Sequence, residues 1–260
     1  MSIKYYDIMK NVKNIAEGDT IEVASDLYLM IKNCAKNGEE FNPDILIDSI
    51  IEKVGLGGTV MIRVWNWDFC HGVPFDRRNT PSQVGALGNV ALRRKEFRRT
   101  KHPLYSFAVC GARRDELCGL DNKSAWGADS PFGYITRICG KQLMLGATMW
   151  NSLTYVHYVE EQIGVPYRYL KDFTGEYIDE DGSSSVRIYQ MNVRDLSLDI
   201  KITSENFAPA FFEANALVTQ DFDGVSVSVV DLAKAYPIIE DDIRNNASGT
   251  FCSYKPKLKT

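Results

Sequence analysis

Two apolar segments and the helix between them limit the folds that this chain can adopt. Residues 21–25 (IEVAS) have the pattern of a short buried strand that ends in polar residues. Residues 43–54 have helical periodicity, with Asn42 as the predicted N-cap and Gly55 at the end. Residues 59–65 (TVMIRVW) give a second buried strand. Because a strand–helix–strand unit almost always pairs its strands in parallel with a right-handed crossover, the pattern predicts an α/β core.

The rest of the chain continues this alternation and then changes character. Helices are predicted at residues 3–16, from Thr80 onward, at 131–138, at 151–163 and at 231–245. Strands are predicted at residues 104–111, 142–147, 183–193, 216–222 and 224–230. The strand at 183–193 alternates apolar and polar residues after a turn at 179–182, which indicates an antiparallel hairpin. We therefore expect a single domain over residues 1–260, with a three-layer α/β/α core, a mixed sheet, antiparallel C-terminal additions and a mobile tail at 255–260.

Composition excludes several classes of protein. Of the 260 residues, 45% are hydrophobic and 25% are charged, a balance typical of globular domains. The net charge of −4 lacks the basic excess of a nucleic-acid-binding protein. No apolar segment approaches the roughly 20 residues that cross a bilayer, and the N-terminus has no apolar signal core. We therefore expect a cytoplasmic protein without a membrane span.

The cysteines and histidines argue against disulfides and metal sites. The six cysteines are scattered and form no CxxC pair, which is typical of reduced thiols. The three histidines, His71, His102 and His157, have no metal-ligand spacing to the cysteines. No metal is therefore expected.

The segment from Thr80 to Gly85 predicts a helix start that can bind an anion. Thr80 is placed to cap the helix, Pro81 fits its first position, and Gln83 completes a capping box. Backbone N–H groups and the hydroxyls of Thr80 and Ser82 would face the ligand, and Gly85 would allow a close approach. Basic residues follow at Arg93, Arg94, Arg98, Arg99, Lys101 and His102. An ordinary helix start with a solvated basic face has the same pattern.

His157 and Glu160 stand three residues apart in the predicted helix 151–163, which places them on one helix face. A carboxylate beside an imidazole fixes its tautomer and stabilises its protonated form, as a general base requires. The preceding strand ends near the start of this helix, and ligands of open α/β sheets bind at the carboxyl ends of strands. A purely structural pair is the alternative.

Further candidate residues follow the first two strands. Ser25 stands at the carboxyl end of the first strand, where it can face a ligand or cap a helix. The loop after the second strand contains Trp65, Trp67, Asp68 and His71. Such side chains can hold a polar ring and its cation, or they can pack the loop. His102, which precedes the strand containing Ser106, fits an active-site loop and a simple turn equally well. No GxSxG, GxGxxG or GxxxxGK[ST] motif is present.

Four segments resemble the aminoglycoside 3-N-acetyltransferase family. They are GLGGTVMIRVW at 55–65, PFDRRNTPSQVGALGNVALRRKEFRRTKHPLYSFAVCG at 74–111, SPFG at 130–133 and TYVHYVEE at 154–161. The resemblance covers about residues 15–165. It implies acetyl-CoA-dependent acylation of an amine on a sugar, with His157 and Glu160 as the catalytic pair. It places coenzyme A contacts at Ser25, Thr80, Ser82, Gly85, Arg98, Arg99, His102 and Ser106. The expected substrate contacts are Trp65, Trp67, Asp68, His71 and Asp76.

The chain also departs from this family's pattern. Where the antibiotic enzymes usually have V-H-S-S-L, residues 23–27 are VASDL, and Tyr105 stands where a second histidine is usual. The family is also similar to N-acyltransferases that act on nucleotide-linked amino sugars of surface polysaccharides. A polycationic aminoglycoside favours a strongly acidic cleft, of which the mixed charges of this chain give no strong sign.

The leading hypothesis is therefore direct transfer from acetyl-CoA, or another acyl-CoA, to a nucleotide-linked amino sugar, with a histidine general base. An aminoglycoside acetyltransferase that confers antibiotic resistance is the alternative, and an inactive CoA-binding homologue is a further one. The expected partners are the acyl-CoA and the amino sugar, without nucleic acid. The formation of a homo-oligomer is left open.

Overall fold

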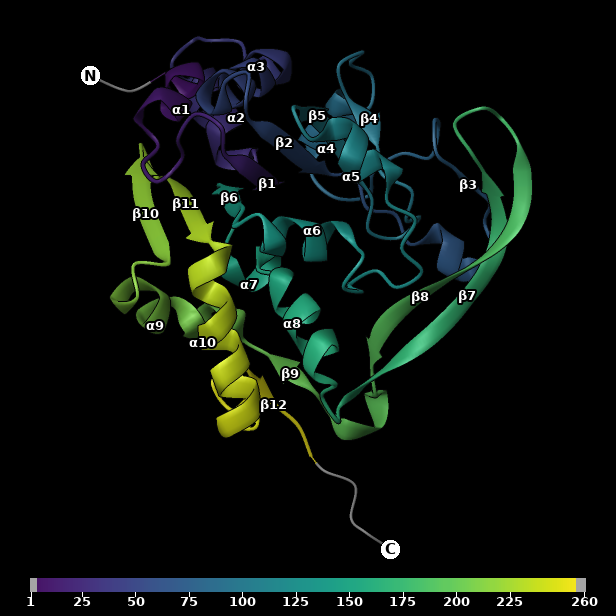
Figure 1. Cartoon of the computed structure of the whole chain (residues 1–260). Helices are drawn as coiled ribbons and strands as arrows, with labels where there is room; N and C mark the ends of the chain where they lie inside the picture. The colour runs from purple at the N-terminus through teal and green to yellow at the C-terminus, as the bar shows by residue number, and fades with distance from the viewer. Residues whose placement is uncertain (1–3, 256–260) are drawn as a thin grey trace, which may run out of the picture.

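The computed structural model of the chain describes residues 4–255. Its main element is a seven-stranded sheet with the strand order β10-β11-β6-β1-β2-β5-β4 (Figure 1). The parallel strands at its centre are β1 (Thr20–Ser25), β2 (Thr59–Arg63) and β6 (Lys141–Leu145). The predicted parallel pair is confirmed, since Val23 pairs with Ile62 of β2 on one side and with Leu143 of β6 on the other.

Antiparallel strands extend the sheet on both sides. They are β5 (Phe107–Gly111) and β4 (Arg98–Arg99) beyond β2, and β11 (Val225–Asp231) and β10 (Leu217–Phe222) beyond β6. Asp223 and Gly224 join β10 to β11 in a two-residue turn, and both have positive φ, which matches the right-handed twist of a hairpin. The predicted mixed sheet with antiparallel C-terminal additions is confirmed.

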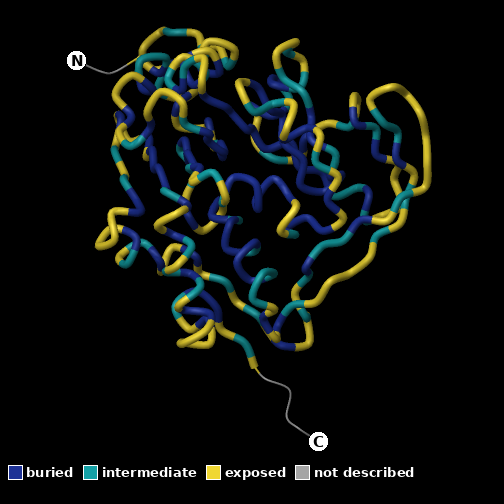
Figure 2. Tube along the Cα trace, viewed as in Figure 1, coloured by how far each residue is buried: buried dark blue, intermediate teal, exposed yellow. Residues whose placement is uncertain are grey.

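Helices cover both faces of the sheet, and an apolar core lies under each layer. Met61 packs into one core whereas its neighbours Val60 and Ile62 pack into the other, because successive strand residues point to opposite faces. The face of Val60 carries α1 (Ile8–Asn11), α2 (Tyr28–Lys36), α3 (Pro43–Val54) and α4 (Ala86–Ala91). The face of Met61 carries α5 (Arg114–Gly119), α6 (Pro131–Arg137), α7 (Met149–Ser152), α8 (Tyr155–Ile163), α9 (Ala208–Glu213) and α10 (Leu232–Asn245). Figure 2 shows the central strands as buried, so the predicted three-layer core is confirmed.

A long hairpin extends beyond the sheet. Its strands β7 (Arg168–Ile178) and β8 (Ser184–Arg194) pair along their whole length, and β3 (Phe75–Asp76) pairs in parallel with the end of β7. In Figure 1 the hairpin curves along the right side of the molecule, and its base lies near the end of α8. The remaining short elements are η1 (Tyr5–Asp7), η2 (Asp68–His71), η3 (Leu196–Leu198), β9 (Lys201–Ile202), η4 (Ser204–Phe207) and β12 (Cys252–Ser253). The hairpin brings residues from late in the chain to the helix that carries His157.

The predicted helix start at Thr80 is wrong. Helix α4 begins only at Ala86, and the hydroxyl of Thr80 instead accepts a hydrogen bond of 2.8 Å from the Asp76 amide in a tight turn. The Gln83 side chain accepts from the Trp67 amide at 2.9 Å and so bonds another loop. The polar groups that suggested a capping box are therefore used in bonds between and within loops, which local sequence spacing does not reveal.

Two other predicted helices differ in extent. The helix expected at 3–16, whose first residue lies outside the described part, is limited to η1 and α1, and Asn14 has a left-handed φ of 63° that prevents its continuation. The helix expected at 151–163 is divided into α7 and α8. The tail predicted to be mobile at 255–260 falls outside the described residues except for Lys255. Between residues 4 and 255, no helix combines the length and apolar character needed to cross a bilayer.

Candidate active site

His157 and Glu160 form a close pair on α8. His157 Nδ1 lies 2.7 Å from Glu160 Oε2, and the carboxylate is fully buried whereas the imidazole side chain is 21% exposed. A nitrogen without a proton would repel a carboxylate at this distance, so we assign the proton of the neutral ring to Nδ1, which donates a hydrogen bond to Glu160. The other ring nitrogen, Nε2, is then the proton acceptor, as in a general base.

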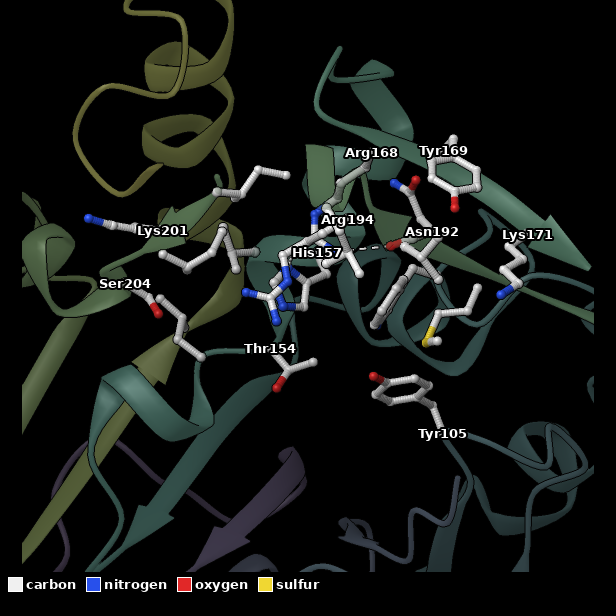
Figure 3. A pocket seen from close by; sticks show the side chains of 18 of the residues that line it. Tyr105, Thr154, His157, Arg168, Tyr169, Lys171, Asn192, Arg194, Lys201 and Ser204 are labelled. Atoms are coloured by element: carbon white, nitrogen blue, oxygen red, sulfur yellow. Dashed lines mark hydrogen bonds between the residues drawn. The ribbon is translucent and has the colours of Figure 1, made fainter. Parts of the chain in front are cut away.

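Arg168 of β7 extends this pair into a group of three. Its Nε lies 2.7 Å from Glu160 Oε2, and its Nη2 lies 3.0 Å from His157 Nδ1. Its Nη1 donates a bond of 3.0 Å to the Asn192 carbonyl on β8 (Figure 3). The arginine thus holds the base of the hairpin against the helix that carries the histidine.

The surroundings set the charge states of the pair. Burial is the largest cause that lowers the pKa of His157 below its ordinary value, and the positive charge of Arg168 is the second. Burial alone would raise the pKa of Glu160, but His157 and Arg168 together hold that pKa below its ordinary value. The pair therefore consists of a carboxylate and a neutral imidazole near pH 7, which is the state that accepts a proton.

A break between α7 and α8 positions the histidine. The Ser152 carbonyl accepts hydrogen bonds from Arg63 and, at 2.7 Å, from Gln142. Arg63 is itself held by a buried ion pair with Glu22 on the neighbouring strand. Because these side chains of the sheet bind the carbonyl at the end of α7, a new helix starts beyond it. His157 consequently stands in the first turn of α8, above the carboxyl ends of the strands.

Two adjoining cavities meet at this histidine. The first, which we term the loop cavity, has a volume of about 720 Å³ and is lined by the carboxyl ends of β1 and β2, the turn after β6 and the loop before α4. The second, which we term the hairpin cavity, has a volume of about 860 Å³ and is lined mainly by β7, β8 and the segment after β8 (Figure 3). Both are lined by Trp67, Tyr105, Asn151, Thr154 and His157. One base can thus serve groups bound on either side of it.

Ser25 and Gly85 shape one wall of the loop cavity. Gly85 precedes α4 and has a φ of +63°, a conformation that favours glycine. A Cβ atom at this position would lie 3.3 Å from Ser25 Oγ and 3.4 Å from the Ser25 carbonyl oxygen. The glycine therefore allows the backbone before α4 to approach Ser25 more closely than a residue with a side chain could.

The structure brings part of the predicted site together. Ser25, Gly85, Trp65 and Trp67 line the loop cavity together with His157. Glu160 is buried behind His157 and lines neither cavity. The remaining predicted residues, all within the described part of the chain, also line neither cavity: Asp68, His71, Asp76, Thr80, Ser82, Arg98, Arg99, His102 and Ser106. In residues 4–255, no three His, Cys, Asp or Glu side chains lie close enough together to hold a metal ion.

The basic segment after α4 supports the loops of the site. Arg99 is buried, and it donates 2.8 Å and 2.9 Å bonds to the Val64 carbonyl and the Ser106 hydroxyl. Burial lowers the pKa of Arg99 to about 9, and burial likewise lowers the pKa of His102 to about 4. Arg98 forms a 2.7 Å ion pair with a carboxylate at the tip of the hairpin. These side chains hold the scaffold around the cavities.

The polar residues predicted to bind substrate are similarly engaged. Asp68 accepts a 2.8 Å bond from Gln83, and Asp76 accepts a 2.8 Å bond from Asn79. The His71 ring lies 3.2 Å from a carbonyl of its own loop and is exposed. The side chains of Asp68, His71 and Asp76 thus form contacts within the segment between β2 and α4.

Several cavity residues carry no local sequence signal that marks them. Thr154 stands three residues before His157, and this spacing is the one local feature that could have indicated it. Arg168 and Arg194 lie opposite each other at the base of the hairpin, and only the folded chain brings them to α8. Asn151 lines both cavities from α7.

A base between two adjoining cavities at the carboxyl edge of an α/β sheet fits a group-transfer enzyme with room for a donor and an acceptor. Residues 36–242 match the family described as aminoglycoside 3-N-acetyltransferase. Since the match spans most of the chain, the chain belongs to the aminoglycoside 3-N-acetyltransferase family. The resemblance seen in the sequence is confirmed, and so is the predicted class of enzyme, a CoA-dependent N-acyltransferase that acts on an amine.

Solved structures share the fold at low sequence identity. Aminoglycoside acetyltransferase AAC(3)-Xa has a TM-score of 0.76 at 19% identity, over 94% of this chain and 92% of that one. AAC-IIIb, solved in a binary complex with CoASH, has a TM-score of 0.74 at 19% identity, over 93% and 95%. Sisomicin-bound AAC-VIa has a TM-score of 0.76 at 17% identity, over 95% and 99%. The CoASH complex agrees with the predicted cosubstrate. No curated protein sequence matches the chain.

Proposed function

We propose that residues 1–260 act as one acyltransferase domain that transfers the acetyl group of acetyl-CoA to an amine of an amino sugar. The observation that carries this proposal is the position of the His157–Glu160 pair where the two cavities meet. The loop cavity suits the thioester arm of acetyl-CoA, because its volume of about 720 Å³ extends from Ser25 and Gly85 to His157. The hairpin cavity then receives the acceptor. This assignment supports transfer within a ternary complex, without an acyl-enzyme.

The chemistry assigns a role to each member of the pair. His157 Nε2 takes a proton from the acceptor amine as its nitrogen attacks the thioester carbonyl, and the new C–N bond replaces the C–S bond. The same proton then passes to the departing thiolate, which gives CoASH. Glu160 holds the ring in the required tautomer and stabilises the transient imidazolium. Trp65 and Trp67 offer flat apolar faces to the reactants.

The other residues predicted to bind coenzyme A are assigned a supporting role. They hold the loops around the loop cavity, and they are Thr80, Ser82, Arg98, Arg99, His102 and Ser106.

The cytoplasmic location expected from the sequence stays a prediction. The structure shows only that no helix of residues 4–255 could cross a bilayer.

Two classes of amino sugar are candidates for the acceptor. The family description names aminoglycosides, and AAC-VIa was solved with sisomicin bound. These comparisons support an aminoglycoside better than the nucleotide-linked amino sugar that the sequence hypothesis favours. One structural observation favours the second class, because the hairpin cavity is lined by cations and by no carboxylate among the described residues.

Release of free CoA thiol should require an amino-sugar amine. Thiol release from acetyl-CoA, measured with kanamycin, gentamicin, glucosamine and phosphorylated amino sugars, tests the proposed function directly. We expect turnover with at least one member of this panel and none with the corresponding sugars that lack an amine. Binding of CoA, seen as a higher melting temperature, without turnover on any amine would instead identify an inactive CoA-binding homologue.

The pH profile should have an acid limb below the ordinary histidine value. The base must be neutral, and burial and Arg168 lower the pKa of His157 from 6.5. The deprotonated fraction, and with it kcat/KM, should therefore rise with pH through an apparent pKa below 6.5. Arg168→Met should move this limb to higher pH because it removes a positive charge beside the ring. The acceptor amine must also be neutral to attack, so it adds an acid limb of its own at its own, higher pKa. An acid limb that moves with the pKa of the acceptor but not with Arg168→Met would contradict the assignment.

A further inference from the structure

The charges of the hairpin cavity have a single sign. Its lining contains the cations Arg168, Lys171, Arg194 and Lys201, and contains no aspartate or glutamate among the described residues. Arg168 is neutralised by the buried carboxylate of Glu160. Within residues 4–255, the other three form no ion pair within 4.0 Å. The cavity therefore carries a net positive charge, and no carboxylate of residues 4–255 pairs with these three cations within 4.0 Å.

The cations surround the place where the acceptor amine must lie. Arg194 stands opposite Arg168 at the base of the hairpin, and its charge acts on the His157 ring. In Figure 3, Arg194 points toward His157, while Lys171 and Lys201 lie on opposite sides of it. An acceptor that reaches Nε2 of the histidine is therefore placed among positive charges on more than one side.

This distribution of charge selects against a polycation. Every further ammonium group of a polyamine would lie in a cleft whose walls repel it, and a cleft lined by one sign of charge concentrates ligands of the other sign. Arginine and lysine are the side chains that bind phosphate and carboxylate groups in proteins. The amine that reacts is neutral when it attacks, so only the rest of the acceptor must match the cavity.

Exposed aromatic rings at the same cavity indicate a second property of the acceptor, a flat ring. Trp150 is 59% exposed and Tyr169 is 51% exposed, and both line the hairpin cavity together with Trp67. Large aromatic side chains that remain exposed beside cationic ones form stacking surfaces for sugar rings and nucleobases. A ligand with a flat ring and an anionic group satisfies both features.

We infer that the acceptor of this enzyme is an amino sugar that also carries a phosphate group, bound by Lys171, Arg194 and Lys201 in the hairpin cavity. This inference rests on the proposed acyl transfer and narrows its acceptor. The phosphate can belong to a simple sugar phosphate or to the diphosphate of a nucleotide-linked sugar. The stacking surfaces favour the nucleotide-linked form.

Acceptor kinetics with four amines test the inference. The probes are UDP-glucosamine, glucosamine 6-phosphate, glucosamine and kanamycin. We expect kcat/KM to be highest for one of the two phosphorylated amines, and the choice between these two identifies the source of the phosphate. Arg194→Ala should lower kcat/KM for the preferred phosphorylated amine about 10- to 100-fold more than kcat/KM for glucosamine, the range for a lost hydrogen bond to a charged group, because any effect of Arg194 on His157 is common to both acceptors. Lys36→Ala, on the exposed end of α2 and away from both cavities, is the matched control and should leave every acceptor unchanged.

The outcomes separate this inference from the proposed function. Three results would overturn the inference and leave acyl transfer intact. The first is a higher kcat/KM for kanamycin than for the phosphorylated amines. The others are that Arg194→Ala lowers kcat/KM equally for charged and uncharged acceptors, or that it raises the KM for acetyl-CoA and not for the acceptor. If no amine is acetylated, the proposed function fails, and calorimetric binding of UDP-glucosamine and glucosamine 6-phosphate to wild type and Arg194→Ala still decides the inference. Binding that the substitution weakens at least tenfold supports it, and binding that is absent or unchanged refutes it.

Discussion

Replacing His157 with alanine is expected to lower kcat by about 10²- to 10⁴-fold, the usual contribution of a positioned general base. The affinity for CoA should change little, because the ring lies where the two cavities meet and the loop cavity keeps its other walls. Steady-state kinetics with the best acceptor, together with calorimetric titration of CoA, measure both quantities. A variant that retains wild-type turnover would show that another group removes the proton.

His157→Gln is the matched control for this experiment. Glutamine fills similar space and still forms hydrogen bonds, but its amide does not take up a proton at neutral pH. Its kcat should fall by the same order as that of the alanine variant. If glutamine restored most of the activity, the contribution of His157 would be one of packing and orientation.

Replacing Glu160 with alanine is expected to have the largest effect on stability. Glu160 is fully buried and lies 2.7 Å from both His157 Nδ1 and Arg168 Nε, so its removal leaves a buried arginine without its partner. Breaking a buried ion pair from one side costs about 3–5 kcal/mol. For a chain of this size, a loss of this order corresponds to a decrease in Tm of roughly 6–20 °C, measured by calorimetry or circular dichroism. An unchanged Tm would show that Arg168 does not depend on this carboxylate.

A double variant separates stability from catalysis. Glu160→Ala combined with Arg168→Met removes both charges, and buried ion pairs replaced by apolar side chains are often no less stable. We expect part of the lost stability to return while kcat stays low, because nothing fixes the tautomer of His157. Recovery of both properties would mean that Glu160 acts only as the partner of Arg168.

The departures from the family pattern fall at the site. Ala24, at the position where the antibiotic enzymes usually have a histidine, lines the loop cavity. Tyr105, at the second such position, lines both cavities, and its ring centre lies 4.9 Å from that of Trp65 and 4.7 Å from that of Trp126. An aromatic cluster thus stands where the family places an ionisable side chain.

The charged surroundings of the acceptor could not be predicted from net charge. A value of −4 over the whole chain says nothing about one cleft, and the sequence gives no indication that Lys171, Arg194 and Lys201 share a cavity. They come from two strands and a later segment that meet only in the folded protein. The sequence hypothesis of a nucleotide-linked acceptor depended on the family resemblance and on the lack of an acidic bias in the chain, whereas the structural argument depends on the charges that line one cavity.

The amino-acid sequence by itself determined the central strands of the sheet, the parallel pairing of the first two of them and the His157–Glu160 pair. Each of these follows from local periodicity or from spacing along one helix, where a few neighbouring residues contain the whole signal. The tertiary structure decided that Thr80 lies in a turn, that a helix is broken after Ser152, and that Arg168 stands beside the His157–Glu160 pair. These features depend on hydrogen bonds and ion pairs between residues far apart in the chain, whose energies overrule local preference and leave no local pattern.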